Sequence, residues 1–381
     1  MGAASKRITT LAKSFKDSGH NVRIVCPLPN YPDGQILRNY RGKLKVKETI
    51  DGVRIDRLWI FPSNSKNLIL RVMSMVSFAI SLFIYIPFIK RTSVDTLIVQ
   101  SPPLFVSFFA VLLGRHVLRK RICLNVSDLW PKSALELGVL HPGKMYQLLL
   151  WMERVIYRKS DLVIGQSKEI IEHVSSFTNN PKLVYRNLPN FEVEDRIVLT
   201  ENYSKKVVYA GLLGFAQGVF EICKEVNFKE LDVEFHIYGK GMQEEEIRSY
   251  VNSHPDNNIY FHGAFEASQV DKVLSQYQAA LVPLIDRIYG AVPSKIFELI
   301  HLRIPIIFAG GGEGASIIEK HGLGLTCTPG DTKEMAQRIS EFSRFEESKV
   351  KEIHDNLRKV KETEFDYNHQ FASLLEFLNK D

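Results

Sequence analysis

Residues 279–308, AALVPLIDRIYGAVPSKIFELIHLRIPIIF, decide the fold of this chain because they hold a strand, a helix start and a second strand in succession. Residues 279–283 and 304–308 are short apolar runs typical of buried strands. Between them, Pro293 and Ser294 suit the first turn of a helix. A strand–helix–strand succession is the repeating unit of a parallel sheet.

The start of this helix also carries groups that can bind a nucleotide. The unpaired N–H groups of a first helical turn attract phosphate oxygens, and Lys295 adds a positive charge there. Glu298 lies one turn further along the same face and can accept hydrogen bonds from a ribose diol. The same residues equally fit an ordinary helix cap with a surface lysine and glutamate, so by themselves they leave both interpretations open.

The rest of the second half repeats this alternation, with further strands expected at 207–210, 233–238 and 259–262. The rhythm predicts a doubly wound parallel sheet, whose ligands bind beyond the carboxyl ends of the strands. Glycines follow three of the strands: Gly211, Gly214 and Gly218; Gly239 and Gly241; Gly310, Gly311 and Gly312. Several glycine loops at the same edge of the sheet indicate a phosphate or sugar site, rather than glycines that serve only to form turns.

The first half shows the same α/β pattern, with strands expected at 22–26, 53–60, 96–100, 122–126 and 162–164. One hydrophobic core seldom grows to 381 residues, so two domains are expected. We predict a Rossmann-like domain at 1–190, a second at 204–362, and a C-terminal helix within 363–381 that can cross back onto the first domain. The active site is expected in a cleft between the two domains.

Four motifs in order resemble one known family. They are Ser127-Asp128-Leu129-Trp130-Pro131, then Tyr209-Ala210-Gly211 with Ala216-Gln217-Gly218, then Val292-Pro293-Ser294-Lys295 with Glu298, then Gly310-Gly311-Gly312-Glu313-Gly314-Ala315. Together they resemble the family 4 glycosyltransferases of GT-B fold, in particular the branch that adds amino- or deoxysugars in bacterial capsule and O-antigen assembly. The resemblance implies a retaining hexosyltransferase that uses a nucleotide-diphosphate sugar, expected to be a UDP-sugar, as donor. It implies a C-terminal donor domain and an N-terminal acceptor domain.

The resemblance also assigns roles to individual residues. Asp128 would face the reacting centre, Ser294 and Lys295 would bind the donor diphosphate, and Glu298 would bind the ribose. The full donor set is Gly211, Gly214, Gln217, Gly218, Pro293, Ser294, Lys295, Glu298, Gly311, Gly312, Glu313 and Gly314, and the acceptor side has Gly2, Ala3 and Trp130. No cofactor is implied, since the nucleotide sugar is a substrate, and no metal site is expected because no His, Cys, Asp and Glu cluster has compelling ligand spacing.

The sequence departs from the family pattern in three places, and these departures put catalytic activity in doubt. Gly290 stands where relatives often carry a first glutamate, with Asp286 as a possible substitute. Phe215 stands where many have a cation, and Arg287 is either its replacement or a solvated loop charge. The chain also opens at the glycine turn, so the first strand of the N-terminal sheet is expected to be missing.

These departures keep two other functions open. The first is a degenerate, catalytically impaired protein that binds a nucleotide sugar without transferring it. The second is a nucleotide-sugar epimerase or dehydrogenase. That enzyme needs a Gly-x-Gly-x-x-Gly turn after an early strand, which is not evident near the start.

Charge is concentrated in the first half, since residues 1–122 carry 20 Lys and Arg against 6 Asp and Glu. Such a basic surface fits anionic lipid better than nucleic acid, because aromatic interleaving of the kind that reads RNA or DNA is absent. Within it, residues 72–89 are an uncharged apolar run flanked by Lys66, Arg71, Lys90 and Arg91. An interfacial helix, a buried core helix and a membrane span all fit this run. Its large residues Phe78, Leu82 and Phe83 are expected to contact lipid.

The expected location is the cytoplasmic side of the plasma membrane, with the protein bound peripherally. No cleavable secretory signal is visible at the start of the chain. The four scattered cysteines, Cys26, Cys123, Cys223 and Cys327, predict no disulfide framework. The expected acceptor is a polyprenyl-diphosphate-linked saccharide.

Overall fold

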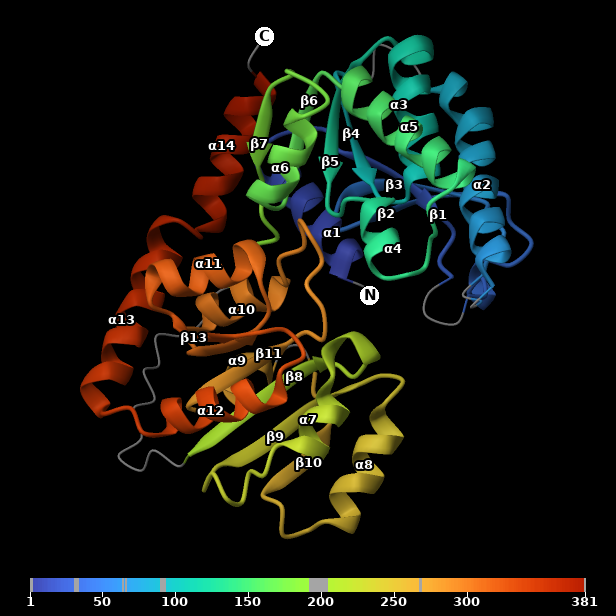
Figure 1. Ribbon diagram of the computed structural model, residues 1–381. Coiled ribbons are helices and arrows are strands. Elements are labelled where there is room, and N and C mark those ends of the chain that lie inside the picture. The colour runs from blue at the N-terminus through green and yellow to red at the C-terminus, as the bar shows by residue number, and fades with distance from the viewer. Residues whose placement is uncertain are drawn as a thin grey trace. The chain divides into compact units, whose positions relative to one another are not determined.

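The computed structural model describes residues 3–30, 34–63, 65, 67–89, 94–191, 205–266 and 269–379. The chain divides into two compact units (Figure 1). Unit 1 comprises Met1–Arg186 with Phe371–Asp381, and unit 2 comprises Asn187–Gln370. Of the residues between the two predicted domains, 192–203 lie outside the described residues.

Unit 2 is built on a six-stranded parallel sheet with the strand order β10-β9-β8-β11-β12-β13. The strands are β8 (Lys206–Leu212), β9 (Glu234–Lys240), β10 (Ile259–Gly263), β11 (Ala279–Pro283), β12 (Ile306–Ala309) and β13 (Gly324–Cys327). Ala280 of β11 pairs with Val208 on one side and Ile306 on the other, and all three are buried. Continuous apolar strands of this kind are covered on both faces. The order reverses between β8 and β11, and this switch point is where such sheets bind ligands.

Seven helices of unit 2 connect or flank these strands in the described part. They are α7 (Val219–Glu225), α8 (Glu244–Ser253), α9 (Val270–Leu274), α10 (Ser294–Leu302), α11 (Gly312–His321), α12 (Thr332–Ser343) and α13 (Glu347–Thr363). The helix predicted to begin near Pro293 is α10, and Pro293 is its N-cap residue. A short 3-10 turn, η5 (Phe215–Gln217), follows β8.

Unit 1 contains two sheets. The first is parallel, in the order β4-β5-β6-β7, with β4 (Thr96–Ser101), β5 (Arg121–Val126), β6 (Leu162–Gly165) and β7 (Lys182–Val184). The second has the order β1-β3-β2, with β1 (Arg23–Pro27), β2 (Lys45–Ile50) and β3 (Val53–Leu58), and its β2 is antiparallel to β3. The helices are α1 (Ala3–Asp17), α2 (Leu68–Tyr85), α3 (Leu104–Leu113), α4 (Lys132–Glu136), α5 (Lys144–Lys159) and α6 (Lys168–Ser175), with short turns η1 (Arg38–Tyr40), η2 (Ile86–Phe88) and η4 (Gly114–Leu118).

Unit 1 has two separate sheets rather than one continuous sheet. No strand precedes α1 in the described residues, and there β1 pairs only with β3 while β4 pairs only with β5. Val25 of β1 and Leu97 of β4 nevertheless pack against the same hydrophobic cluster, which includes Phe78 and Leu82. Shared side-chain packing therefore joins the two sheets.

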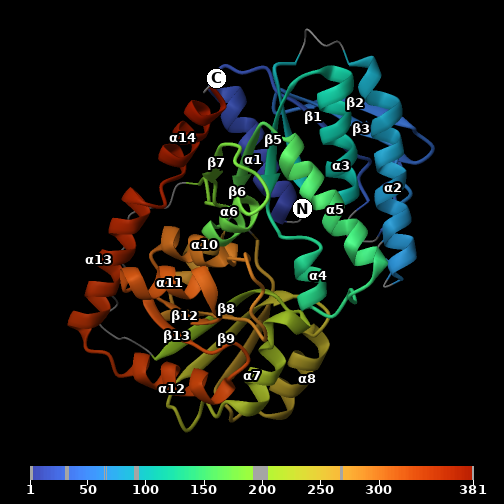
Figure 2. The same ribbon diagram turned by 45° about the horizontal axis from the view of Figure 1, so that its top comes forward.

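The apolar run at 72–89 forms most of α2 and all of η2. Asn67 caps the helix, since its side chain accepts a hydrogen bond from the Ile69 N–H at 2.9 Å. Phe78 and Leu82 are buried in the cluster, so the expectation that they contact lipid is wrong. Phe83, by contrast, is exposed. Helices α2, α3 and α5 lie side by side in unit 1 (Figures 1 and 2).

The C-terminal helix α14 (Tyr367–Asn379) contributes its last turns to unit 1. The Phe371 ring packs edge-on against Phe15 of α1, with 5.2 Å between centroids. Arg121 at the start of β5 donates a hydrogen bond to the Leu378 carbonyl at 2.7 Å. These contacts attach the chain terminus to both α1 and the parallel sheet.

Candidate functional site

The loops after β8 and β11 touch at the switch point of unit 2. Gly218 has a left-handed backbone with φ of 62°, and a Cβ there would lie 2.9 Å from Ile285 Cγ1. The Ile285 N–H donates to the Ala216 carbonyl at 3.0 Å. Glycine at 218 thus meets two needs, because it accepts this conformation and leaves room for Ile285.

The loop after β12 meets the same segment. The Leu284 N–H donates to the Ala309 carbonyl at 2.9 Å, and a Cβ on Gly311 would lie 3.0 Å from Arg287 Cδ. The structure therefore brings the glycine loops after β8 and β12 to one short segment, residues 284–287, with the β8 loop at Ile285 and the β12 loop at Leu284 and Arg287. Ile285 was not identified from the sequence, since an isoleucine after a strand carries no chemical signal of its own.

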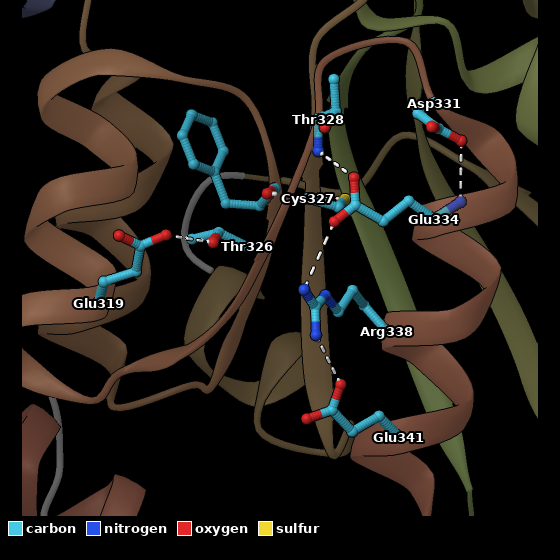
Figure 3. Close-up of polar contacts among 9 residues, drawn as sticks. Glu319, Thr326, Cys327, Thr328, Asp331, Glu334, Arg338 and Glu341 are labelled. Carbon is cyan, nitrogen blue, oxygen red and sulfur yellow. Dashed lines mark hydrogen bonds and ion pairs between the residues drawn. The ribbon is translucent and has the colours of Figure 1, made fainter.

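A third loop, between β13 and α12, also contacts this segment, and Figure 3 shows the polar contacts within that loop. Asp331 caps α12 by accepting from the Glu334 N–H at 2.8 Å, and Glu334 accepts from the Thr328 N–H at 2.8 Å. These two hydrogen bonds fix the loop at the start of α12. The Gly330 N–H then donates to the Leu284 carbonyl at 2.9 Å.

The start of α10 carries the predicted diphosphate and ribose groups, and the structure pairs them with each other. Lys295 Nζ lies 2.8 Å from Glu298 Oε2, and each side chain is a little over one quarter exposed. A partly exposed pair of this kind contributes only about 0–1 kcal/mol. A ligand with a diphosphate and a diol can therefore replace it at small cost.

Close packing holds α10 and α11 together next to this pair. A Cβ on Gly314 would lie 3.0 Å from the Phe308 ring and 3.1 Å from Ile296 Cδ1. Gly312 begins α11, and Glu313 in its first turn is buried. Gly314 thus allows α11 to approach β12 and α10 closely.

The remaining donor-side residues are Gly211, Gly214 and Gln217. Gly211 lies within β8, and a Cβ there would be 3.0 Å from the Tyr209 hydroxyl oxygen. A Cβ on Gly214 would lie 3.0 Å from Gln217 Oε1, so these two residues are neighbours in the loop. Phe215 lies between them, is 58% exposed and supplies no positive charge.

The predicted catalytic residue, Asp128, follows β5 in unit 1. Its Oδ2 accepts a hydrogen bond from Ser133 Oγ at 3.2 Å. Burial raises the pKa of Asp128, while hydrogen bonds from Ser133 and the Leu129 N–H oppose the shift. Trp130 is partly buried and precedes a cis peptide bond to Pro131. A partly desolvated carboxyl group suits a site that handles charge or protons.

Two of the predicted acceptor-side residues lie at the start of the chain. Gly2 lies outside the described residues, and Ala3 is described only as the first residue of α1. Within the described ranges, no group of three or more His, Cys, Asp and Glu side chains has a geometry that could hold a metal ion. The four cysteines are free thiols.

Family models match both halves of the chain. The model of the glycosyl transferase 4-like domain matches residues 2–190, and that of the glycosyl transferases group 1 matches residues 203–344. The chain is a family 4 glycosyltransferase.

Two similar curated proteins are named as glycosyltransferases. This glycosyltransferase is 24% identical over 334 residues to the probable glycosyltransferase WbjE of Pseudomonas aeruginosa, covering 82% of each chain. It is also 24% identical over 241 residues to the putative colanic acid biosynthesis glycosyl transferase WcaI of Escherichia coli K12, covering 58% of each.

Solved structures show that the glycosyltransferase has the GT-B fold. A trehalose-6-phosphate structure from E. coli, bound with UDP-2-fluoro glucose, matches with a TM-score of 0.71 at 11% identity, covering 100% of this chain and 96% of that one. Sucrose-phosphate synthase from Thermosynechococcus elongatus matches with a TM-score of 0.69 at 13% identity, covering 99% and 93%. At these identities the likeness concerns the fold alone.

Proposed function

We propose that this glycosyltransferase moves an N-acetylated amino- or deoxyhexose from a UDP-sugar to a polyprenyl-diphosphate-linked saccharide, with retention, in capsule or O-antigen synthesis. The observation that carries the donor half is the meeting of the glycine loops after β8 and β12 at residues 284–287 of unit 2. The name of the relative WcaI, a putative colanic acid biosynthesis glycosyl transferase, supports the polysaccharide context.

Donor binding is proposed to exchange one ion pair for two contacts. Lys295 turns from Glu298 to the diphosphate, and the released Glu298 carboxylate accepts hydrogen bonds from the ribose diol. As the bond to the sugar breaks, negative charge grows on the leaving diphosphate. Lys295 and the N–H groups at the start of α10 then stabilise that charge.

The donor site is tested by titrating the full chain with UDP. Lys295→Ala should weaken binding about 10- to 150-fold, because a charge-assisted hydrogen bond contributes about 1.5–3 kcal/mol. Lys359→Ala, an exposed lysine of α13, is the matched control and should leave the dissociation constant unchanged. An unchanged UDP affinity in Lys295→Ala, with the circular dichroism spectrum of the wild type, would remove Lys295 from the site.

Transfer itself is tested with membranes that contain lipid-linked saccharide and a panel of labelled nucleotide sugars. Gly290 and the exposed Phe215 stand at positions where many members of the family carry charged groups, and this favours one alternative, a binder that has lost turnover. UDP binding without transfer from any donor in the panel would identify that alternative.

We further propose that unit 1 binds the cytoplasmic face of the membrane peripherally. The helix Ile69–Phe88 is long and apolar enough to span a bilayer by length and composition. One face of it is buried, however, and Tyr85 donates a hydrogen bond to Asp56 at 2.8 Å. The opposite face is an apolar stripe of Ile69, Met73, Ile80, Phe83 and Ile84, which are 49–69% exposed. A helix with one buried face and one exposed apolar face fits an interfacial helix better than a core helix or a membrane span.

Helix α5 carries a second set of exposed apolar side chains. Its exposed residues include Met145, Leu148 and Trp151, and the Trp151 ring lies 5.5 Å from Phe108 of α3. The exposed cations on α5 are Lys144, Arg154, Arg158 and Lys159. Aromatic and basic side chains on one surface suit the headgroup region, where each cation contributes about 1 kcal/mol on anionic lipid. Three predicted flanking cations, Lys66, Lys90 and Arg91, lie outside the described residues.

Sedimentation with anionic vesicles tests the membrane surface. The variant with Ile80→Ser, Phe83→Ser and Ile84→Ser should stay soluble while keeping the wild-type UDP affinity. Met242→Ser, which removes an equally exposed side chain of unit 2, should still sediment. Brominated lipid should quench tryptophan fluorescence in the wild type but less in Trp151→Phe. Equal sedimentation of all variants and no difference in quenching would contradict this surface.

A further inference from the structure

Arg7 of α1 is held at the carboxyl end of the four-stranded sheet in unit 1. Its Nη1 donates to Gln166 Oε1 at 2.8 Å, and its Nη2 donates to Asn125 Oδ1. Asn125 is the penultimate residue of β5, and Gln166 directly follows β6. The guanidinium group therefore lies at the edge where parallel sheets of this class bind their ligands.

The two amide groups that hold Arg7 are fixed in orientation by neighbours. Asn125 Nδ2 donates to Gln100 Oε1 of β4 at 2.9 Å, and Gln166 Nε2 donates to the Ser127 carbonyl. Gln100 in turn donates to Ser127 Oγ at 2.7 Å. Because the amide N–H groups are used in this way, both amide oxygens face the arginine. The network is neutral apart from Arg7.

The charge of Arg7 has no counter-ion in the described part of the protein. No carboxylate there lies within ion-pair distance, and Nε is buried without a hydrogen-bond partner. Burial lowers the pKa of Arg7 to about 10, with Tyr185 opposing the shift. A buried charge without a partner is costly, whereas a neutral side chain could hold the same two amides.

We propose that Arg7 binds an anionic group of the acceptor, a phosphate or a carboxylate, at the carboxyl edge of the sheet in unit 1. A guanidinium group has five N–H donors, and the two amides use only two of them. A phosphate or carboxylate can accept hydrogen bonds from the remaining guanidinium N–H groups, and it supplies the missing negative charge. Asp128 lies just beyond Ser127 on the loop after β5, so the anion would be bound next to the predicted reacting residue. The inference rests on the proposed function for the acceptor side only.

Binding of inorganic pyrophosphate to the full chain tests the site. The measurement uses the Lys295→Ala background, so that the donor site does not contribute. Adding Arg7→Gln should weaken pyrophosphate binding at least tenfold, and Arg7→Lys, which keeps the charge but loses the fork, should lie between. Arg358→Gln, an exposed arginine of α13, is the control. Equal pyrophosphate affinity of Arg7→Gln, Arg7→Lys and the background protein would overturn the proposal. If Arg7→Gln does not fold, the comparison of Arg7→Lys with the background protein decides the test.

Acceptor kinetics then distinguish the source of the anion. If the group is the lipid diphosphate, Arg7→Lys should raise the KM for a diphosphate-linked saccharide and leave the KM for its neutral glycoside analogue unchanged. If the group is a sugar carboxylate, the KM should rise only for acceptors that contain a uronic acid. In both cases the UDP affinity of unit 2 stays at the wild-type value, so failure here is separable from failure of the donor site. An equal KM for every acceptor in Arg7→Lys and the wild type would reject the role.

Discussion

Gly330→Ala is a direct test of whether the β13–α12 loop supports the donor site. Gly330 has φ of 72°, and a Cβ there would lie 2.8 Å from the Ile285 carbonyl oxygen. The left-handed conformation costs an alanine about 1–2 kcal/mol. Contact with a backbone oxygen that cannot rotate away adds about 1–3 kcal/mol of overpacking. The total expected loss in the free energy of unfolding is about 2–5 kcal/mol.

Gly322→Ala separates the two contributions. Gly322 has φ of 59°, but a Cβ there would meet only the Asn356 side-chain amide at 3.0 Å. That side chain can move, so this variant should lose only the conformational part, about 1–2 kcal/mol.

Urea denaturation compares the two variants, and UDP titration supplies a second measurement. Displacement of Ile285 in Gly330→Ala should weaken UDP binding, whereas Gly322→Ala should bind UDP as the wild type does. Equal stability losses and equal UDP affinities in the two variants would refute the support role of the loop.

Three further predictions follow from single contacts. His236 and His262, whose ring nitrogens lie 2.9 Å apart, both have pKa values lowered chiefly by burial. The unfolded chain therefore takes up protons first, so their contribution to stability is complete above about pH 6.5 and is lost as the pH falls below it; urea denaturation of His262→Asn should show less acid destabilisation than the wild type. Ser133→Ala removes a hydrogen bond that lowers the pKa of Asp128, so the acid limb of the pH–rate profile should move to higher pH, and an unmoved limb would exclude Asp128 as the titrating group. Glu298→Gln should weaken binding of a normal donor more than binding of its 2′-deoxy or 3′-deoxy analogue, and equal losses would remove Glu298 from the ribose contact.

The strands and glycine loops of unit 2 could be predicted from the sequence because their causes are local. Apolar runs such as 279–283 form buried strands wherever a parallel sheet covers both faces. Gly218 follows a strand and needs a left-handed backbone, which the glycine itself makes possible.

Tertiary structure alone decided which side chains these elements bring together. In residues 72–89 the sequence shows only that the whole helix is apolar, while packing buries Phe78 and exposes Phe83. The Lys295–Glu298 pair, the contacts of three loops with residues 284–287 and the buried charge of Arg7 likewise depend on which residues lie close in space. The physical reason is that periodicity and composition define the chemistry of a surface, whereas its burial and its partners depend on residues far away in the chain.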